Sequence, residues 1–289
     1  MLAIAPTTPT TLYVYGRRGV YKSADGGATW RAVNRGLELG EMNSVSALSI
    51  DPTNSRVVFA GTRNGVYKST DGGESWRKAE GYFPEINALS IDPTNSQVIV
   101  AGTRTGVYKS TDGGETWDRI STWRANALSI DPANPQVIVA RTDKGVIRSA
   151  DGGETWRAVG LPGRSVRSLA IHPIEPATLF AGTNDNGDNA LFRSTDGGAT
   201  WSESVRTYSG ITAVVIDPNA PATVYAASKM LLRSTDGGAT WSREKGSPLS
   251  SSSLLLVTDP AQPPTIYVGT LISGVWRQAI DKVRWEPYP

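Results

Sequence analysis

Short apolar runs separated by turn residues recur along the chain. In a clear example, residues 45–50, 56–60, 65–69 and 74–78 form four runs that are rich in β-branched or aromatic side chains. Gly, Pro, Asn or Asp bounds each run, which is typical of β-strands. The pattern therefore predicts a sheet of four short strands, which we name A to D in chain order.

A second pattern, Ser-(Thr/Ala)-Asp-Gly-Gly-x-(Thr/Ser)-Trp, occurs once in each of six such units. Its aspartates are Asp25, Asp71, Asp112, Asp151, Asp196 and Asp236. Successive aspartates lie 46, 41, 39, 45 and 40 residues apart. A period of about 40 residues with Gly and Trp marks is typical of the blades of a β-propeller. Because the motif follows the third run of its unit, we expect it in the C–D turns of blades 1–6.

The two ends of the chain set the number of units at seven. Residues 2–6 match the close of the later A strands, so the chain is expected to begin with strand A of blade 1. The strands of blade 7 are expected at 254–260, 266–268, 274–277 and 283–285. Residues 280–282 replace the Asp-Gly-Gly of the motif there, but Trp285 keeps the position of its Trp. No blade is then shared between the termini, and closure rests on blade 1 packing against blade 7.

The predicted fold is an all-β, seven-bladed β-propeller with four antiparallel strands per blade, forming a single domain over residues 1–289. The blades are expected at approximately 1–34, 35–80, 81–122, 123–160, 161–207, 208–246 and 247–289.

Composition limits the chemistry that this fold can carry. The 289 residues include no Cys and a single His, which excludes disulfides, a cysteine nucleophile and the common kinds of zinc site. The formal net charge of +2 is too small to indicate a nucleic-acid partner. No apolar run approaches the ~18 residues of a membrane-spanning helix. We therefore expect no cofactor, no metal, no nucleic acid and no membrane insertion.

The repeated motif resembles the Asp-box, or bacterial neuraminidase repeat, of Asp-box propellers. Six copies match closely, and the repeat covers essentially the whole chain. Propellers with this motif include sialidases, xyloglucan-cleaving glycosidases, sortilin-like receptors and the photosystem II assembly-factor propeller. The resemblance implies the fold and favours an extracytoplasmic location, periplasmic or secreted with a signal removed, but it leaves the function open.

The residues of the repeat itself are interpreted as structural. A box aspartate accepts backbone N–H groups in a tight turn, paired glycines allow positive φ, and the Trp forms an apolar wedge between blades. The single histidine, His172, takes the place of an Asp before Pro in other repeats, so we interpret it as a turn residue. A basic residue precedes each box, and these are expected to form a solvated strand face: Lys22, Lys68, Lys109, Arg148, Arg193, Arg233 and Arg277.

Candidate binding residues lie in loops on the face opposite the boxes. The B–C loops of blades 1–3 place an arginine at one equivalent position, and the D–A loops add aromatic and basic residues. The candidates are Arg17, Arg18, Arg63, Arg104, Trp123, Arg124, Asp143 and Tyr82. Guanidinium groups suit carboxylates and phosphates, and an exposed aromatic ring suits a sugar or a partner's side chain. The alternative is that the arginines are ordinary solvated residues and that Trp123 caps the core locally.

Three functions remain open at this point. The first is a non-catalytic binding or scaffolding propeller that holds a protein segment or an acidic or saccharide ligand. The second is a glycoside hydrolase, whose two carboxylates would lie about 5–10 Å apart, although no pair of loop acids is singled out by its spacing. The resemblance weakens this function, because the similar sialidases have six blades and the xyloglucan-cleaving relatives divide their catalytic acids between two propellers. The third is a structural module without a ligand. The sequence favours the first and assigns no catalytic residue.

Overall fold

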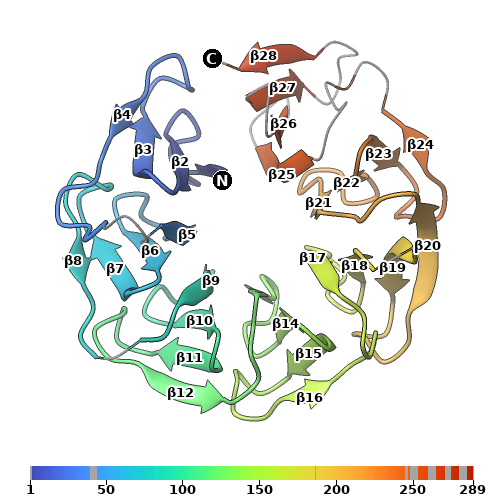
Figure 1. Ribbon diagram of the computed structural model, residues 1–289, viewed down its shortest axis with the longest axis horizontal. Helices are drawn as coiled ribbons and strands as arrows, with labels where there is room; N and C mark the ends of the chain where they lie inside the picture. Colours follow the sequence, from blue (N-terminus) through green and yellow to red (C-terminus); the bar gives the residue numbers. More distant parts are fainter. Residues whose placement is uncertain are drawn as a thin grey trace. The chain divides into compact units, whose positions relative to one another are not determined.

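The computed structural model describes residues 2–39, 44–81, 83–185, 187–244, 247, 253–259, 265–270, 275–279 and 285–288. In this part of the chain it contains 28 β-strands and no helix (Figure 1). The strands form seven four-stranded antiparallel sheets, each built from consecutive strands in chain order. The predicted all-β, seven-bladed propeller is therefore confirmed.

The chain divides into two compact units, and the boundary between them passes through blade 4. One comprises Met1–Thr142 and Ser149–Arg157, and the other comprises Asp143–Arg148 and Ala158–Pro289. The prediction of a single domain stays a prediction.

The first three blades lie wholly in the first unit. Blade 1 contains β1 (Leu2–Ile4), β2 (Leu12–Gly16), β3 (Gly19–Ser23) and β4 (Arg31–Ala32). Blade 2 contains β5 (Val45–Ile50), β6 (Val58–Thr62), β7 (Gly65–Ser69) and β8 (Arg77–Lys78). Blade 3 contains β9 (Ile86–Ile91), β10 (Ile99–Thr103), β11 (Val107–Ser110) and β12 (Asp118–Ser121). Blade 4, which is divided between the two units, contains β13 (Ala127–Ile130), β14 (Ile138–Thr142), β15 (Gly145–Ser149) and β16 (Arg157–Ala158).

The last three blades lie in the second unit. Blade 5 contains β17 (Val166–Ile171), β18 (Leu179–Thr183), β19 (Asn189–Ser194) and β20 (Ser202–Thr207). Blade 6 contains β21 (Ala213–Ile216), β22 (Val224–Ala227), β23 (Leu231–Ser234) and β24 (Ser242–Arg243). Blade 7 contains β25 (Ser253–Asp259), β26 (Thr265–Thr270), β27 (Val275–Ala279) and β28 (Glu286–Tyr288). The first and last sheets are each built from one end of the chain, as predicted.

The hydrophobic cores lie between neighbouring blades. All five residues of β6, β10 and β18 are buried. These B strands read as continuous apolar runs because adjacent blades cover both of their faces. Tyr13 of blade 1 and Val58 and Trp76 of blade 2 belong to one core cluster, while Phe59 of blade 2 and Ile99 of blade 3 belong to the next.

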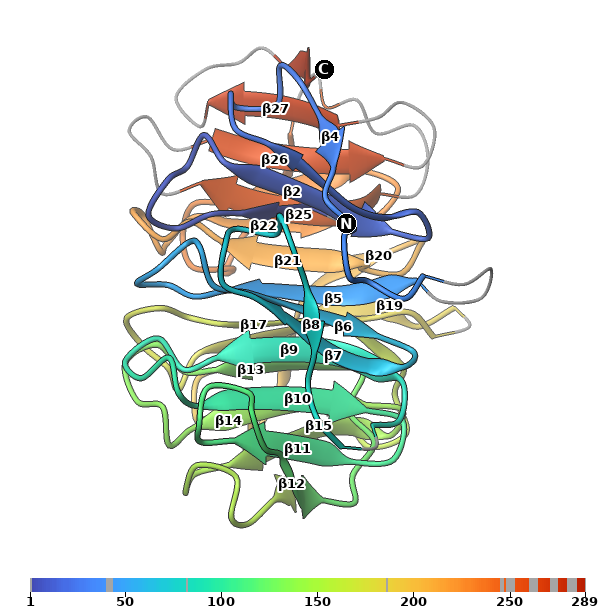
Figure 2. The same cartoon turned by 90° about the vertical axis from the view of Figure 1, so that its left-hand side faces the viewer.

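The antiparallel order of strands sorts the loops onto two faces. The A–B and C–D turns of a blade share one edge, and the B–C and D–A loops share the other. Figure 2 shows β5, β6, β9 and β10 running across the view, with their connecting loops at the two sides. Arginines in the B–C loops are therefore separated from the Asp-boxes by the length of a strand.

The predicted extent of the D strands was wrong. Residues 74–78 were expected to pair, but only Arg77 and Lys78 form β8. Hydrogen bonds from Ser75 to Asp71 keep the box in a closed turn, so pairing begins only after the Trp. In blade 7 the described D strand is likewise Glu286–Tyr288, after Trp285, and residues 283 and 284 of the predicted strand lie outside the described part of the chain. Residues 280–282 lie outside the described part of the chain.

Candidate functional site

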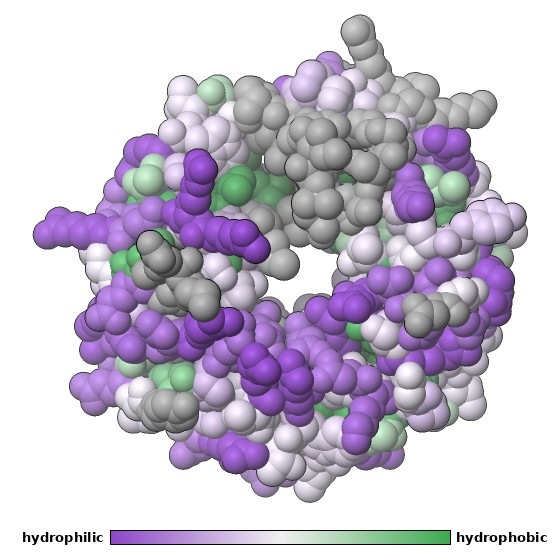
Figure 3. Space-filling view, in the orientation of Figure 1, coloured by the Kyte–Doolittle hydropathy of each residue, from purple (hydrophilic) through white to green (hydrophobic). Residues whose placement is uncertain are grey.

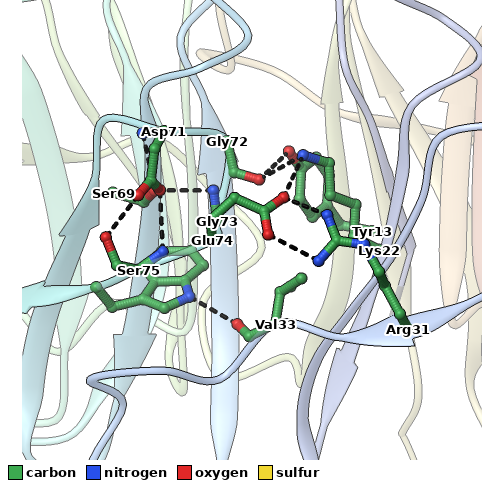
Figure 4. A network of polar contacts seen from close by, with 11 residues as sticks. Tyr13, Lys22, Arg31, Val33, Ser69, Asp71, Gly72, Gly73, Glu74 and Ser75 are labelled. Atoms are coloured by element: carbon green, nitrogen blue, oxygen red, sulfur yellow. Dashed lines mark hydrogen bonds and ion pairs between the residues drawn. The ribbon is translucent and has the colours of Figure 1, made fainter.

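Each Asp-box is a turn closed by its own side chains. In blade 2, Ser69 Oγ donates to Asp71 Oδ1 at 2.7 Å, and Ser75 donates its N–H to the same oxygen at 3.0 Å. The Ser75 hydroxyl donates to Asp71 Oδ2 at 2.5 Å (Figure 4). Gly72 and Gly73 have φ of 75° and 87°, a conformation that glycine adopts at little cost. The same contacts recur around Asp25, Asp112, Asp151, Asp196 and Asp236.

These hydrogen bonds favour the ionised carboxylates. The hydroxyl and N–H of Thr29 lower the pKa of Asp25 to about 2, and Thr200 does the same for Asp196. Burial raises the pKa of Asp71, but the Ser75 and Ser69 donors outweigh burial and bring the pKa to about 2. The pKa values of the other three are lowered by the same kinds of donor. At neutral pH the carboxylates therefore serve as acceptors within their own turns.

Basic residues before the boxes connect neighbouring blades. Lys22 Nζ donates to Gly72 O at 2.8 Å in the next blade's box and lies 3.3 Å from Glu74 Oε1 (Figure 4). Lys68 Nζ lies 3.0 Å from Glu115. The side chains of Lys22 and Lys68 are only 14% and 19% exposed. The expectation of a solvated face was therefore wrong for these lysines, because their ammonium groups bond to the following blade.

His172 is part of an A–B turn. Its Nδ1 accepts the N–H of Glu175 at 2.9 Å and that of Ile174 at 3.3 Å. Asp51 Oδ1 receives the corresponding pair of N–H groups in blade 2. The geometry matches the interpretation of His172 as a turn residue.

The predicted arginines lie at the tips of consecutive B–C loops. Arg17 and Arg18 join β2 to β3, Arg63 lies between β6 and β7, and Arg104 follows β10. All four are exposed. Arg104 Nη1 lies 3.3 Å from Glu85 Oε2, whereas the Arg63 side chain makes no hydrogen bond or ion pair within the described part of the chain. Hydrophilic residues are spread around the ring on the face shown in Figure 3, including over blades 1 and 2.

Two of these arginines meet in one groove. A groove of about 480 Å³ is lined by Arg63, Asn64, Lys78, Gly81, Phe83, Pro84, Glu85, Arg104 and Thr105. It brings together the B–C loops of blades 2 and 3 and the segment that joins these blades. Three cationic side chains and one carboxylate line it, so its net charge is positive. Lys78 lies 3.9 Å from Glu38 and is 40% exposed.

Phe83 fixes the shape of this groove. The residue is only 6% exposed, and its ring packs edge-on against Trp117 with ring centroids 5.8 Å apart. Gly65, with φ of 124°, brings its backbone so close that a Cβ there would lie 3.2 Å from the Phe83 ring. The charged side chains of the groove therefore lie over a well-packed base that Phe83 forms with Gly65 and Trp117.

Sequence reasoning found only part of this site. Arg63 and Arg104 line the groove, but Arg17, Arg18, Trp123 and Arg124 do not. Tyr82 lies outside the described residues. Lys78, Phe83 and Glu85 were not among the candidates; the Phe83-Pro84-Glu85 segment next to Tyr82 was the available signal, whereas nothing distinguished Lys78 from other strand ends.

The other described candidates, Trp123, Arg124 and Asp143, are exposed. Trp123 is 37% exposed, and its backbone N–H donates a hydrogen bond to Ser121 Oγ at 3.1 Å. Arg124 follows it on the same loop and is also exposed. Asp143 is exposed in the B–C loop of blade 4 and belongs to the second unit.

A second charged cluster lies on strand β20 of blade 5 and on the loops beside it. Arg164 pairs with Asp188 and lies 4.8 Å from the centroid of the Phe192 ring. Arg206 also pairs with Asp188, at 2.7 Å, and with Glu203. Hydrogen bonds from Arg164 and Arg206 lower the pKa of Asp188. This cluster satisfies its own charges, whereas Arg63 in the groove has no such partner within the described residues.

Neither a metal centre nor a spanning helix is found in the part of the chain that the structure describes. No three of its His, Asp or Glu residues are grouped so that they could hold a metal ion. No helix there is long and apolar enough to cross a membrane.

Comparisons with protein families confirm the resemblance to Asp-box propellers. Residues 232–243 match the BNR/Asp-box repeat, and residues 105–203 match the family described as sortilin, neurotensin receptor 3. No curated protein sequence matches the chain.

Solved structures with this fold include enzymes and a peptide-binding protein. An ancestral GH74 enzyme superposes with a TM-score of 0.79 at 18% identity, covering 93% of this chain and 43% of its own. The GH74 xyloglucanase from Xanthomonas campestris gives 0.78 at 17% identity, with 96% and 51% covered. This chain thus spans about half the length of these enzymes. The structure of YCF48 bound to D1 peptide gives 0.72 at 16% identity, covering 92% and 88%.

Proposed function

We propose that this protein is a binding propeller that holds an extended, carboxylate-bearing segment of a partner protein in the groove between the B–C loops of blades 2 and 3. The observation that carries the proposal is the exposed Arg63 guanidinium, which lines the groove and has no ion pair within the described residues. A guanidinium presents a planar set of donors that matches a carboxylate.

The lining of the groove favours a protein segment over a free ion. Arg63, Lys78 and Arg104 offer positive charge from two blades, while the half-buried Pro84 offers apolar surface between them. A ligand that uses the whole groove therefore carries acidic and apolar groups along its length. The fold likeness to YCF48, solved with a bound peptide, supports this kind of ligand, and this chain covers 88% of that protein.

The likeness to the GH74 enzymes supports a saccharide ligand or glycan hydrolysis only through the shared fold. Glu85, the one carboxylate in the groove, is paired with Arg104, and a glycosidase needs two carboxyl groups on either side of the scissile bond. Binding of a peptide is thus better supported than cleavage of a glycan at this position.

The test measures fluorescence anisotropy of a labelled peptide with a repeated Glu-Phe-Ala unit against the purified protein. A Gln-Phe-Ala peptide serves as the uncharged probe, and a xyloglucan oligosaccharide serves as the competitor. We expect binding of the Glu peptide that weakens with salt, because the contacts are exposed ion pairs. Arg63→Ala is expected to weaken binding about tenfold, since it removes a charged hydrogen-bonding group.

Arg56→Ala is the matched control, because Arg56 is an exposed arginine in an A–B turn, on the box face. The proposal is overturned if Arg63→Ala and Arg56→Ala have equal effects, if both peptides bind alike, or if only the oligosaccharide binds.

A further inference from the structure

One kind of turn is repeated at the close of the A strands, and one copy uses a different side chain. In blade 2, Asp51 Oδ1 accepts the N–H groups of Thr53 at 2.8 Å and Asn54 at 3.1 Å. Corresponding pairs at Asp92, Asp131 and Asp217 range from 2.8 to 3.3 Å. In blade 5 the acceptor is His172 Nδ1, with Glu175 N–H at 2.9 Å and Ile174 N–H at 3.3 Å.

The two acceptors differ in the pH range over which they work. A free carboxylate takes up a proton only near pH ~4, whereas a free imidazole does so near pH ~6.5. To accept these N–H groups, His172 must carry its proton on Nε2 and leave Nδ1 bare. Protonation of Nδ1 would place an N–H against two N–H donors, so both hydrogen bonds of the turn would be lost.

The surroundings offer the protonated ring another partner. The turn borders a hollow of about 350 Å³, which the A–B turn and the Asp-box of blade 6 also line. The charged groups facing the hollow are Glu175, Arg193 and Asp236. Asp236 is bonded to Ser234 and Thr240 within its own box. The exposed Glu175 carboxylate lies on the same turn, so it is the anion most available to an imidazolium.

We propose that the His172 turn is a pH-sensitive switch. At neutral pH the imidazole closes the turn as the aspartates do in other blades. When the ring is protonated on acidification, the imidazolium releases the N–H groups of Ile174 and Glu175 and turns toward the Glu175 carboxylate. Ile174, which is 69% exposed, and Glu175 both line the hollow, so the release changes its shape. The switch lies in blade 5 and does not depend on the function proposed for the groove.

The experiment follows the backbone amides of Ile174 and Glu175 by NMR at about pH 8 and about pH 5. We expect their protection from solvent exchange to fall about tenfold on acidification, as expected for loss of a hydrogen bond. Their proton shifts are expected to move upfield with the midpoint of the His172 ring. The amides of Thr53 and Asn54, held by Asp51, are the internal control and are expected to stay unchanged.

Two variants separate titration of the ring from general acid effects. His172→Asp introduces the side chain that other turns use, and His172→Asn supplies an amide oxygen that does not titrate. Both are expected to keep the two amides protected and their shifts unchanged at about pH 5. The proposal is overturned if wild-type amides do not respond, or if they respond equally in His172→Asp or at Thr53 and Asn54.

Discussion

Arg31 of blade 1 and Glu74 of the blade 2 box form a forked ion pair, with Arg31 Nη1 at 2.7 Å from Glu74 Oε2 and Nη2 on Oε1 (Figure 4). Arg77 pairs with Glu115 at the next junction. In blade 3 the equivalent position is Asp118, because it pairs with Lys109 across the strands as Arg31 pairs with Lys22. The repeated ion pair is therefore replaced by two acids at the junction of blades 3 and 4, where Asp118 and Glu154 line one hollow.

Replacing this acid by arginine is expected to stabilise the fold. Asp118→Arg removes a negative charge beside Glu154 and supplies the missing donor, which is worth about 0.5–1 kcal/mol for an exposed pair. The increase in the free energy of unfolding is measured by urea denaturation and is expected to shrink at high salt. Asp118→Ala, which removes the acid without supplying a donor to Glu154, is expected to give a smaller gain. If Asp118→Arg stabilises the protein no more than Asp118→Ala does, the new arginine does not pair with Glu154.

Acid is expected to destabilise the protein through its boxes. The pKa of Asp71 is about 2 in the folded state, below the ordinary value of 3.8. A lowered pKa contributes stability that is fully present above the ordinary value and is lost as the pH falls toward the folded value. Because the pKa values of the other five box aspartates are lowered too, the loss is expected to be steep between about pH 4 and pH 2.

A single substitution tests this origin. Asp71→Asn cannot be protonated and loses the ionic acceptor, so it is expected to be less stable at pH ~7 and to lose less stability on acidification. Glu80→Gln removes an exposed carboxylate outside the boxes and is the matched control. Urea denaturation at several pH values measures both. Parallel pH profiles for Asp71→Asn and the unmodified protein would show that the boxes are not responsible.

The fold could be predicted from the sequence because its signals are local. The partners of Asp71 are Ser69 and Ser75, at most four residues away, so six copies of the motif identify six turns. The groove could be predicted only in part. Lys78, Phe83 and Arg104 come together from the two sides of a blade junction, and no spacing in the sequence records that contact. Lys22 was misread for the same reason, since its acceptor Gly72 lies 50 residues away.

The proposed binding function predicts that the protein does not hydrolyse glycans. Both glycosidase mechanisms use a carboxyl group whose pKa is raised so that it can donate a proton. Within the described residues, the carboxyl pKa values that depart from the ordinary are all lowered. If the protein only binds its ligand, as proposed, incubation with xyloglucan, β-glucans and sialosides is expected to release no reducing sugar. Product release that Asp143→Asn abolishes and Glu80→Gln preserves would contradict this expectation.

Glu85 is expected to compete with the ligand for Arg104. The two side chains lie 3.3 Å apart and are 29% and 55% exposed, so their pairing is weak and a ligand carboxylate can replace it. Glu85→Gln frees the guanidinium and is expected to tighten binding of the Glu-Phe-Ala peptide about two- to fivefold. In an Arg104→Ala background the same substitution is expected to have no effect, because the pair no longer exists. Tightening that persists in that background would mean that Glu85 repels the peptide directly, and that Arg104 does not bind it.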